Sequence, residues 1–331
     1  MANYLVTGAA GFIGSRVTEF LLDGGDSVIG IDNLNDAYDV RVKHYRLARL
    51  QTRPGFSFHQ LDISKRAEIE ARLYSTELAE AAIRPDAVIN LAARAGVRQS
   101  VENPWVYLDT NVTGTLNLLE LCRQLEIPKF ILASTSSIYG ADAPLPTPEE
   151  ADSSHPLQAY AASKKGAEAL CHVYHHLYGI DVSIFRFFTV YGPAGRPDMS
   201  MFRFTQWISE GLPVRLNGDG EQTRGFTYVD DIARGVILGL KPLGYEIMNL
   251  GGHETITMNR LIQMLEEKIG RKAQITHLPI NATEMLANWA NVAKARRLLG
   301  WQPQIGLEQG VSNLVTWYQA ERSWASQINT D

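Results

Sequence analysis

The residues with the clearest chemical potential are a tyrosine and a lysine four positions apart, in the segment Tyr160-Ala161-Ala162-Ser163-Lys164. On a helix, two side chains with this spacing share one face. A phenol is a poor base at neutral pH because its ordinary pKa is about 10, but an adjacent ammonium favours the phenolate and lowers that pKa. Tyr160 can therefore act as a general base with Lys164 behind it, although ordinary exposed helix faces also carry this spacing.

A glycine-rich turn near the start of the chain predicts a site for a dinucleotide. A short apolar strand leads into Gly8-Ala9-Ala10-Gly11-Phe12-Ile13-Gly14, then a helix through Leu22 and a second strand that ends at Asp32. Glycines in such a turn let the backbone approach a pyrophosphate, which the N–H groups at the start of the helix favour. Asp32 would accept hydrogen bonds from the adenosine ribose and repel a 2′-phosphate, so the pattern favours NAD over NADP. A tight turn without a ligand is the alternative.

Apolar runs alternate with helical patterns along the first part of the chain and predict a doubly wound parallel sheet. The further strands expected are Phe56 to Leu61, Ala87 to Leu91, Phe130 to Ala133 and Val182 to Phe187. Ligands of such sheets bind beyond the carboxyl ends of the strands. The expected rim of the site is Asp62-Ile63, Ala92-Ala93-Arg94, Ser134 to Ser137 and Phe188-Thr189.

The sequence pattern changes after Tyr191, where glycines and prolines come close together. We expect residues 1–190 to form an NAD-binding Rossmann domain and residues 191–331 to form the substrate domain, with part of 225–250 returning to the Rossmann domain. The predicted fold class is therefore α/β, a Rossmann-type doubly wound parallel sheet with a smaller C-terminal mixed α/β substrate domain.

Composition excludes several classes of function. A net charge of −5 gives no general electrostatic attraction for nucleic acid or for an anionic membrane. We expect a cytoplasmic protein, because there is no targeting segment, no apolar run near the length of a membrane span, and only two cysteines. His172 and His176 lie next to Cys171 but lack the remaining ligands of a zinc motif, so no metal is expected.

Taken together, these residues resemble the extended short-chain dehydrogenase/reductases, specifically their nucleotide-sugar epimerase and dehydratase branch. The resemblance covers nearly the whole chain. The matching pieces are Gly8, Gly11 and Gly14, Asp32-Asn33, Asp62-Ile63, Asn90-Leu91-Ala92-Ala93, Asn111, Ser134-Thr135-Ser136-Ser137, Tyr160 with Lys164, and Arg224 before Phe226-Thr227-Tyr228-Val229-Asp230-Asp231.

The resemblance implies a role for each matching residue. Thr135 hydrogen-bonds the reacting sugar hydroxyl, Tyr160 takes its proton, Lys164 holds the ribose and tunes the tyrosine, and Arg224 pairs with the diphosphate. The cofactor residues implied are Gly8, Gly11, Phe12, Ile13, Gly14, Asp32, Asn33, Asn35, Asp62, Ile63, Leu91, Ala92, Ala93, Arg94, Asn111, Tyr160 and Lys164. The substrate residues implied are Ser136, Ser137, Thr189, Arg196, Val214, Arg215, Leu216 and Arg224. Family members are also homodimers, so the apolar helices 111–124 and 168–178 fit a dimer interface, and burial against the sheet is the equal alternative.

The implied reaction is epimerisation at C4 of a UDP-hexose. Hydride leaves C4 for NAD, the 4-keto sugar turns over in the site, and hydride returns to its other face. Dehydratases of this branch carry Asp-Glu where this chain has Ser136-Ser137, and decarboxylases tend to carry glutamate at the second position. Hydroxyls cannot replace these acids near neutral pH, so both outcomes are disfavoured.

The segments 187–193 and 195–199 resemble those of UDP-glucuronate 4-epimerases, and the segment Asp32 to Tyr38 agrees with this resemblance. Arg196, with Ser136, Ser137 and Thr189, would then hold the C6 carboxylate and protect a 4-keto uronic acid from losing carbon dioxide. The alternative for Arg196 is a structural ion pair with Asp198.

Several alternatives stay open. UDP-glucose 4-epimerase is the nearest one, followed by a nucleotide-sugar decarboxylase or dehydratase, a simple reductase, and a non-catalytic NAD-binding protein. Uridine rests on resemblance, and thymidine is the alternative base. Two departures from the family pattern lie near the expected nucleotide cleft: Arg224-Gly225 where Arg-Asp is common, and Ala290-Asn291 where Ala-Asp is common.

Overall fold

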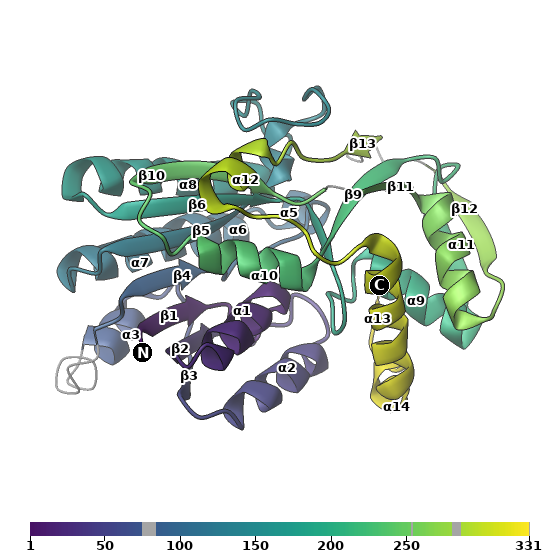
Figure 1. Cartoon of the computed structure of the whole chain (residues 1–331), viewed down its shortest axis with the longest axis horizontal. Helices are drawn as coiled ribbons and strands as arrows, with labels where there is room; N and C mark the ends of the chain where they lie inside the picture. The colour runs from purple at the N-terminus through teal and green to yellow at the C-terminus, as the bar shows by residue number, and fades with distance from the viewer. Residues whose placement is uncertain (75–83, 253, 280–285, 331) are drawn as a thin grey trace.

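A seven-stranded sheet with the order β10-β6-β5-β4-β1-β2-β3 forms the centre of the molecule in the computed structural model, which describes residues 1–74, 84–252, 254–279 and 286–330 (Figure 1). Every neighbouring pair of strands in this sheet is parallel. The strands are β1 Asn3–Thr7, β2 Ser27–Asp32, β3 Phe56–Gln60, β4 Ala87–Asn90, β5 Lys129–Thr135, β6 Asp181–Phe187 and β10 Tyr245–Leu250. The predicted doubly wound parallel sheet is confirmed.

Helices cover both faces of this sheet, which is why a central strand such as β5 is buried along its whole length (Figure 1). One face packs against α1 Phe12–Asp23, α2 Arg41–Gln51, α10 Val229–Leu238 and α12 Ala293–Leu299. The other face packs against α7 Gly114–Gln124 and α8 Ala159–Tyr178. The helix α8 ends at Gly179, whose φ of +69° is a conformation that glycine adopts without strain.

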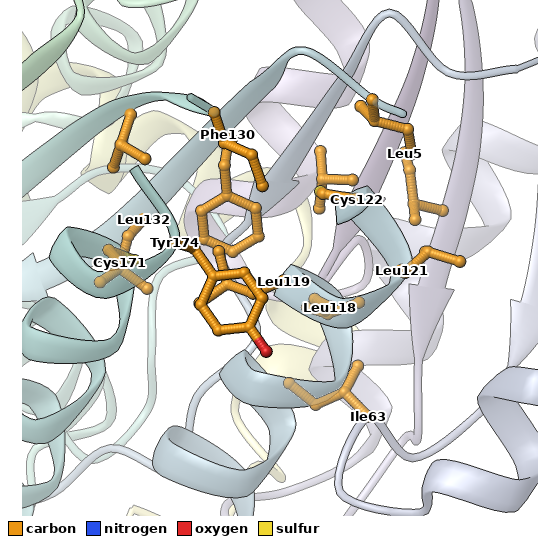
Figure 2. Close-up of a cluster of buried hydrophobic side chains, with 14 of the residues drawn as sticks. Leu5, Ile63, Leu118, Leu119, Leu121, Cys122, Phe130, Leu132, Cys171 and Tyr174 are labelled. Atoms are coloured by element: carbon orange, nitrogen blue, oxygen red, sulfur yellow. The ribbon is translucent and has the colours of Figure 1, made fainter. Parts of the chain in front are cut away.

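Figure 2 shows the core on the face of α7 and α8. Leu118 and Cys122 of α7 and Cys171 of α8 meet Phe130 and Leu132 of β5. Burying each of the larger side chains contributes roughly 1.5 to 3 kcal/mol. Both cysteines are free and buried. Apolar packing therefore fixes α8, the helix that carries Tyr160 and Lys164, against the sheet.

Short helical segments connect the strands on the α7 side. They are α3 Arg66–Ile69, α5 Gln99–Glu102, α6 Trp105–Tyr107, the π-helical turns Glu70–Tyr74 and Leu108–Thr113, and the 3₁₀ turn Ser136–Tyr139. In the described part of the chain, no helix combines the length and the apolar character needed to cross a membrane.

The strands after residue 188, β10 excepted, form two smaller sheets. They are β7 Thr189–Tyr191, β8 Pro213–Asn217, β9 Thr223–Tyr228, β11 Glu254–Thr257, β12 Gln274–Leu278 and β13 Ala287–Asn288. In one sheet β9 pairs with β7, β11 and β13, and in the other β8 pairs with β12. The helices here are α9 Ser200–Glu210, α11 Met258–Ile269, α13 Leu307–Ala320 and α14 Arg322–Ala325. A separate core, which includes Trp207, Phe226 and Leu261, holds this part together.

Candidate active site

A cavity of about 680 Å³ lies beyond the carboxyl ends of the central strands, within the size range of small-molecule sites. One side of it is lined from the large sheet, for example by Gly8, Asp32 and Thr135, and the other from later segments, for example by Phe204 and Arg224. The cavity thus brings most of the predicted cofactor and substrate residues to one place.

The glycine turn between β1 and α1 excludes side chains at its closest approaches. A Cβ atom on Gly14 would lie 2.0 Å from the carbonyl oxygen of Gly8, and one on Gly8 would lie 2.7 Å from the backbone nitrogen of Ala92. Gly8, Gly11, Phe12, Ile13 and Gly14 all line the cavity. The free N–H groups at the start of α1 make this turn a good cradle for a pyrophosphate.

Asp32, the last residue of β2, lies next to Lys43 of α2, a residue that the sequence patterns did not single out. The carboxylate of Asp32 accepts from the backbone N–H of Leu34 at 2.8 Å and lies 3.3 Å from the ammonium of Lys43. The same ammonium donates to the Asn35 side chain at 3.1 Å. Asp32, Asn33, Asn35 and Lys43 all line the cavity.

Asp62 follows β3 and joins this group through Asn33, whose side-chain amide donates to it at 3.0 Å. Burial raises the pKa of Asp62, but hydrogen bonds from Ser64 and Asn33 outweigh that effect and leave the pKa below its ordinary value. The carboxylate is therefore ionised at neutral pH. Asp62 and Ile63 both line the cavity.

The segment after β4 contributes Leu91, Ala92 and Ala93 to the cavity wall, but not Arg94. Asn111 is buried behind this segment. Its amide donates to the Arg94 carbonyl at 3.0 Å and to the Ser163 hydroxyl at 2.9 Å, and accepts from the Arg94 N–H at 2.9 Å. Asn111 thus ties the segment to α8, and its direct contact with the cofactor stays a prediction.

The three candidate catalytic residues come from two neighbouring elements. Thr135 is the last residue of β5, Tyr160 lies in the first turn of α8, and Lys164 lies one turn further on. All three line the cavity. The Thr135 hydroxyl donates to the Ser137 side chain at 3.2 Å and accepts from the Ser137 N–H at 3.2 Å.

Burial acts on the pKa values of both members of the Tyr160 and Lys164 pair. It raises the pKa of Tyr160, against the lowering effects of hydrogen bonding with Thr135 and of the positive charge of Arg196. It lowers the pKa of Lys164 to about 8, although nearby Glu168 raises it. Lys164 is 2% exposed and still charged at neutral pH, so it is well placed to favour the phenolate.

A buried ion pair fixes α8, the helix that carries Tyr160 and Lys164, to the central sheet. Glu168, one turn beyond Lys164, accepts from Arg186 of β6 at 2.8 and 3.0 Å and from the Ser134 hydroxyl at 2.6 Å. Because Arg186 and Ser134 belong to β6 and β5, the pair fixes α8 against both strands. Arg186 also neutralises Glu168, so Lys164 is not needed for that purpose.

The predicted substrate residues divide into two groups. Ser136, Ser137, Thr189, Arg196, Arg215, Leu216 and Arg224 line the cavity. Val214 is fully buried in the core of the later segments and does not line the cavity. The structure therefore does not bring Val214 to the place expected for the nucleotide base.

Arg196 forms a two-point ion pair with Asp198. Its Nε lies 3.0 Å from Asp198 Oδ1, and its Nη2 lies 2.5 Å from Asp198 Oδ2. The ion pair with Asp198, which the sequence offered as the alternative to binding the substrate carboxylate, is thus present. Both residues line the cavity, and a guanidinium has further N–H donors beyond the two used here. Arg196 can therefore still bind an anion.

Several cavity residues carry no local signal in the sequence. Lys43, Arg203 and Asn288 line the cavity, and the Asn288 side chain donates to the Ser136 hydroxyl at 3.2 Å from 152 positions away. Only tertiary structure brings such pairs together.

The two departures from the family pattern have local explanations. A Cβ atom on Gly225 would lie 2.5 Å from Cα of Gly252 and 2.8 Å from Cβ of Trp289, so the backbone packs too closely here for a side chain. The Asn291 side chain accepts from the N–H of Ala293 at the start of α12 at 2.9 Å, as an aspartate would.

His172 and His176 stack on each other with ring centroids 6.4 Å apart, and His172 packs edge to face on Tyr245. Over the described ranges of the chain, no group of three potential ligands is placed to hold a metal ion.

The fold, the glycine turn and the Tyr160 and Lys164 pair define an extended short-chain dehydrogenase/reductase. The chain belongs to the GDP-mannose 4,6 dehydratase family, whose model matches residues 5–314.

Its relatives within that family include both uronic-acid and neutral-sugar epimerases. It is 53% identical over 318 residues to UDP-glucuronate 4-epimerase of Thermodesulfobacterium geofontis, covering 96% of each chain. Bacillus cereus UDP-glucuronic acid 4-epimerase in complex with UDP-glucuronic acid and NAD has a TM-score of 0.87 at 35% identity, covering 96% of this chain and 99% of that one. Thermotoga maritima UDP-glucose 4-epimerase with UDP-glucose also has a TM-score of 0.87, at 31% identity, covering 97% and 99%. The backbone fold alone therefore does not distinguish the two sugars.

Proposed function

We propose that the protein is an NAD-dependent 4-epimerase that interconverts UDP-glucuronate and UDP-galacturonate. The observation that carries this proposal is a cavity with the Tyr160 base, an arginine at position 196 and hydroxyls, not acids, at positions 136 and 137. Such a site can move a proton at C4 and hold a carboxylate, but positions 136 and 137 supply no acid to expel a C6 hydroxyl. The relative at 53% identity is named UDP-glucuronate 4-epimerase, which supports the proposal.

The cofactor site fits NAD on the basis of its own residues. The glycine turn leaves no room for a Cβ at Gly14, so the backbone is open to a pyrophosphate, and Asp32 faces the same cavity as an acceptor for ribose hydroxyls. Bound NAD would accept hydride from C4 and return it.

The residues of this chain supply the proton transfer and the positioning. Tyr160 takes the proton of the C4 hydroxyl and later gives it back, while Thr135 hydrogen-bonds the same oxygen. Lys164 keeps its charge near the phenolate. Arg224 pairs with the diphosphate, since a guanidinium can bind two oxygens at once. Arg196, Ser136 and Ser137 hold the C6 carboxylate away from the geometry in which carbon dioxide leaves.

UDP-glucose 4-epimerisation is the second candidate, and one observation favours it. Arg196 already has a carboxylate partner within the chain, Asp198, so it does not require one from the substrate. In that case the arginine would be structural, and the cavity would accept a neutral hexose.

The deciding experiment gives purified protein UDP-glucuronate, UDP-glucose and dTDP-glucose in parallel, without an added hydride donor. The C4 epimers are resolved and carbon dioxide is followed. We expect UDP-galacturonate from UDP-glucuronate, little turnover of the other sugars and no carbon dioxide. If UDP-galactose is the only product, the protein is a UDP-glucose 4-epimerase. UDP-xylose or a 4-keto-6-deoxy sugar would contradict the inference that Ser136 and Ser137 exclude decarboxylation and dehydration.

A variant separates the role of Arg196 from the rest of the site. In Arg196→Gln the carboxylate is held less firmly, so a larger share of UDP-glucuronate turnover should end in carbon dioxide. The matched control is Arg260→Gln, which makes the same change at a half-exposed arginine of α11. An unchanged ratio of carbon dioxide to epimer in Arg196→Gln would exclude the carboxylate role.

We infer that the protein is a cytoplasmic homodimer that pairs through α7 and α8. Support for the interface comes from Val173, Leu177 and Tyr178 of α8, of which Leu177 is 61% exposed. Light scattering should give twice the mass of the chain, and Leu177→Glu should shift it towards a monomer. Two free, buried cysteines are consistent with a reducing compartment.

A further inference from the structure

Arg46 of α2 is a buried arginine next to the cavity. The hydrogen bonds that its guanidinium donates go to uncharged oxygens. Arg46 is 4% exposed. Its Nε and Nη2 donate to the carbonyl of Ala194 at 2.9 and 2.5 Å, and Nη2 also donates to the carbonyl of Gly195 at 3.0 Å. Its Nη1 donates to the carbonyl of Ala10 at 3.2 Å and to the hydroxyl of Tyr38 at 2.8 Å. Each guanidinium nitrogen is thus hydrogen-bonded.

These acceptors belong to three segments that are distant in sequence. Ala10 lies in the glycine turn, Tyr38 lines the cavity after Asp32, and Ala194 and Gly195 directly precede Arg196. Arg46 itself does not line the cavity. It therefore connects the cofactor turn to the segment that carries the candidate carboxylate ligand, without reaching the reacting atoms.

The segment that Arg46 holds has an unfavourable backbone conformation. Ala194 has a φ of +50°, in the left-handed region that residues with a side chain rarely adopt. Such a conformation persists only where surrounding contacts enforce it. The two hydrogen bonds from Arg46 to the Ala194 carbonyl are contacts of this kind.

The packing around the guanidinium also joins the same segments. Its central carbon lies 5.6 Å from the ring centroid of Phe12 and 5.7 Å from that of Tyr38. A Cβ on Gly195 would lie 3.7 Å from the Phe12 ring, so the ring lies close to the segment that carries Arg196. Burying a guanidinium is unfavourable unless its donors are satisfied, and the bonds to these segments satisfy them.

We propose that Arg46 is a positioning residue that holds the Ala194 to Arg196 segment against the glycine turn and so keeps Arg196 in place beside Tyr160. This proposal rests on the proposed function, in which Arg196 restrains the substrate carboxylate. When the segment shifts, the 4-keto uronate is free to break its C5–C6 bond. Carbon dioxide then leaves, the bonding electron pair passes to C5, which takes a proton from water, and the hydride stays on the cofactor or reduces the 4-keto pentose.

The test compares Arg46→Met and Arg46→Lys with Arg49→Met in the NAD-loaded enzyme. Arg49 lies three residues further along α2 and is half-exposed, so it provides the same chemical change away from the site. For each protein, kcat, KM for UDP-glucuronate, the ratio of carbon dioxide to C4 epimer, and NADH left on the enzyme are measured.

We expect Arg46→Met to lower kcat by about 10- to 100-fold, as small misplacements of a site do, with a smaller change in KM. Its ratio of carbon dioxide to epimer should rise by about tenfold, following the loss of a placed binding group. Arg46→Lys should recover part of both values, because lysine keeps the charge but not the planar fork. Arg49→Met should match the wild type.

The results separate three cases. An Arg46→Met protein that folds, retains NAD and shows the wild-type kcat and product ratio overturns the proposal. If Arg46→Met does not fold, Arg46→Lys decides by the same two readouts. If the wild type epimerises only UDP-glucose, the proposed function fails on its own; the positioning role is then judged from kcat and residual NADH with that sugar, and wild-type values in the variants overturn it.

Discussion

Replacing Lys164 by methionine should stabilise the nucleotide-free protein at neutral pH while removing most of its activity. Burial lowers the pKa of this ammonium from 10.5 to about 8. One pKa unit corresponds to about 1.4 kcal/mol, so keeping the buried lysine charged costs the folded state roughly 3 kcal/mol near pH 7. Glu168 is paired with Arg186, so the substitution leaves no isolated carboxylate behind.

The pH dependence follows from the direction of this shift. The unfolded chain holds the lysine proton up to its ordinary pKa of 10.5, whereas the folded protein releases it at about pH 8. The unfolded state thus binds more protons in this window, and the free energy of unfolding rises with pH. The cost of Lys164 is complete below pH 8 and disappears towards pH 10.5, so the advantage of methionine should shrink across this range.

Urea unfolding followed by tryptophan fluorescence measures this effect on protein freed of NAD. Near pH 7, Lys164→Met should unfold with a free energy about 1 to 3 kcal/mol above the wild type, and near pH 10 with little difference. Lys272→Met is the control, because Lys272 is 88% exposed and its substitution should change stability by less than about 0.5 kcal/mol. Turnover by Lys164→Met should fall by about 100-fold or more. A Lys164→Met protein that is less stable than wild type near pH 7, or whose difference does not vary with pH, would refute the argument.

Three further predictions concern the same site. Tyr160→Phe removes the oxygen that takes the proton, so kcat should fall by about 10² to 10⁴ while NAD titration still shows binding; near-normal turnover would contradict a base role. Gly14→Ala places a Cβ where the Gly8 carbonyl lies, at 2.0 Å, so calorimetry should show at least about tenfold weaker NAD binding, and an unchanged Kd would show that the turn can relax. Wild-type turnover should decline above about pH 8 as Lys164 loses its proton, and a rate that holds constant to pH 10 would assign that pKa elsewhere.

Local patterns in the sequence predicted the elements that need only local information. The glycine turn, the alternation of strands and helices, and the spacing of Tyr160 and Lys164 each depend on neighbours within a few positions. The fold class follows from them, whereas the reaction class was implied by the resemblance to a family. Both agree with the structure and the relatives. The two residues share the first turns of α8, as the four-residue spacing requires.

The remaining features depend on tertiary contacts that no local pattern records. Arg46 and Ala194 are 148 positions apart, and the Asp32 and Lys43 pair forms only when α2 packs against α1 and β3. Val214 was placed by resemblance on the nucleotide side, but its side chain packs into the core of the later segments. Whether Arg196 would meet Asp198 or the cavity could not be decided from sequence, and the structure shows that it does both.

The late return of β10 has a consequence for how the chain must be made. β10 pairs with β6 along six residues, from Tyr245 with Val182 to Leu250 with Phe187. Until residue 250 has left the ribosome, β6 is an edge strand, paired with β5 on one side and unpaired on the other. Unprotected edges recruit strands from other molecules. A fragment that stops near residue 190 should therefore aggregate more readily than the whole chain, in which β6 lies between β5 and β10.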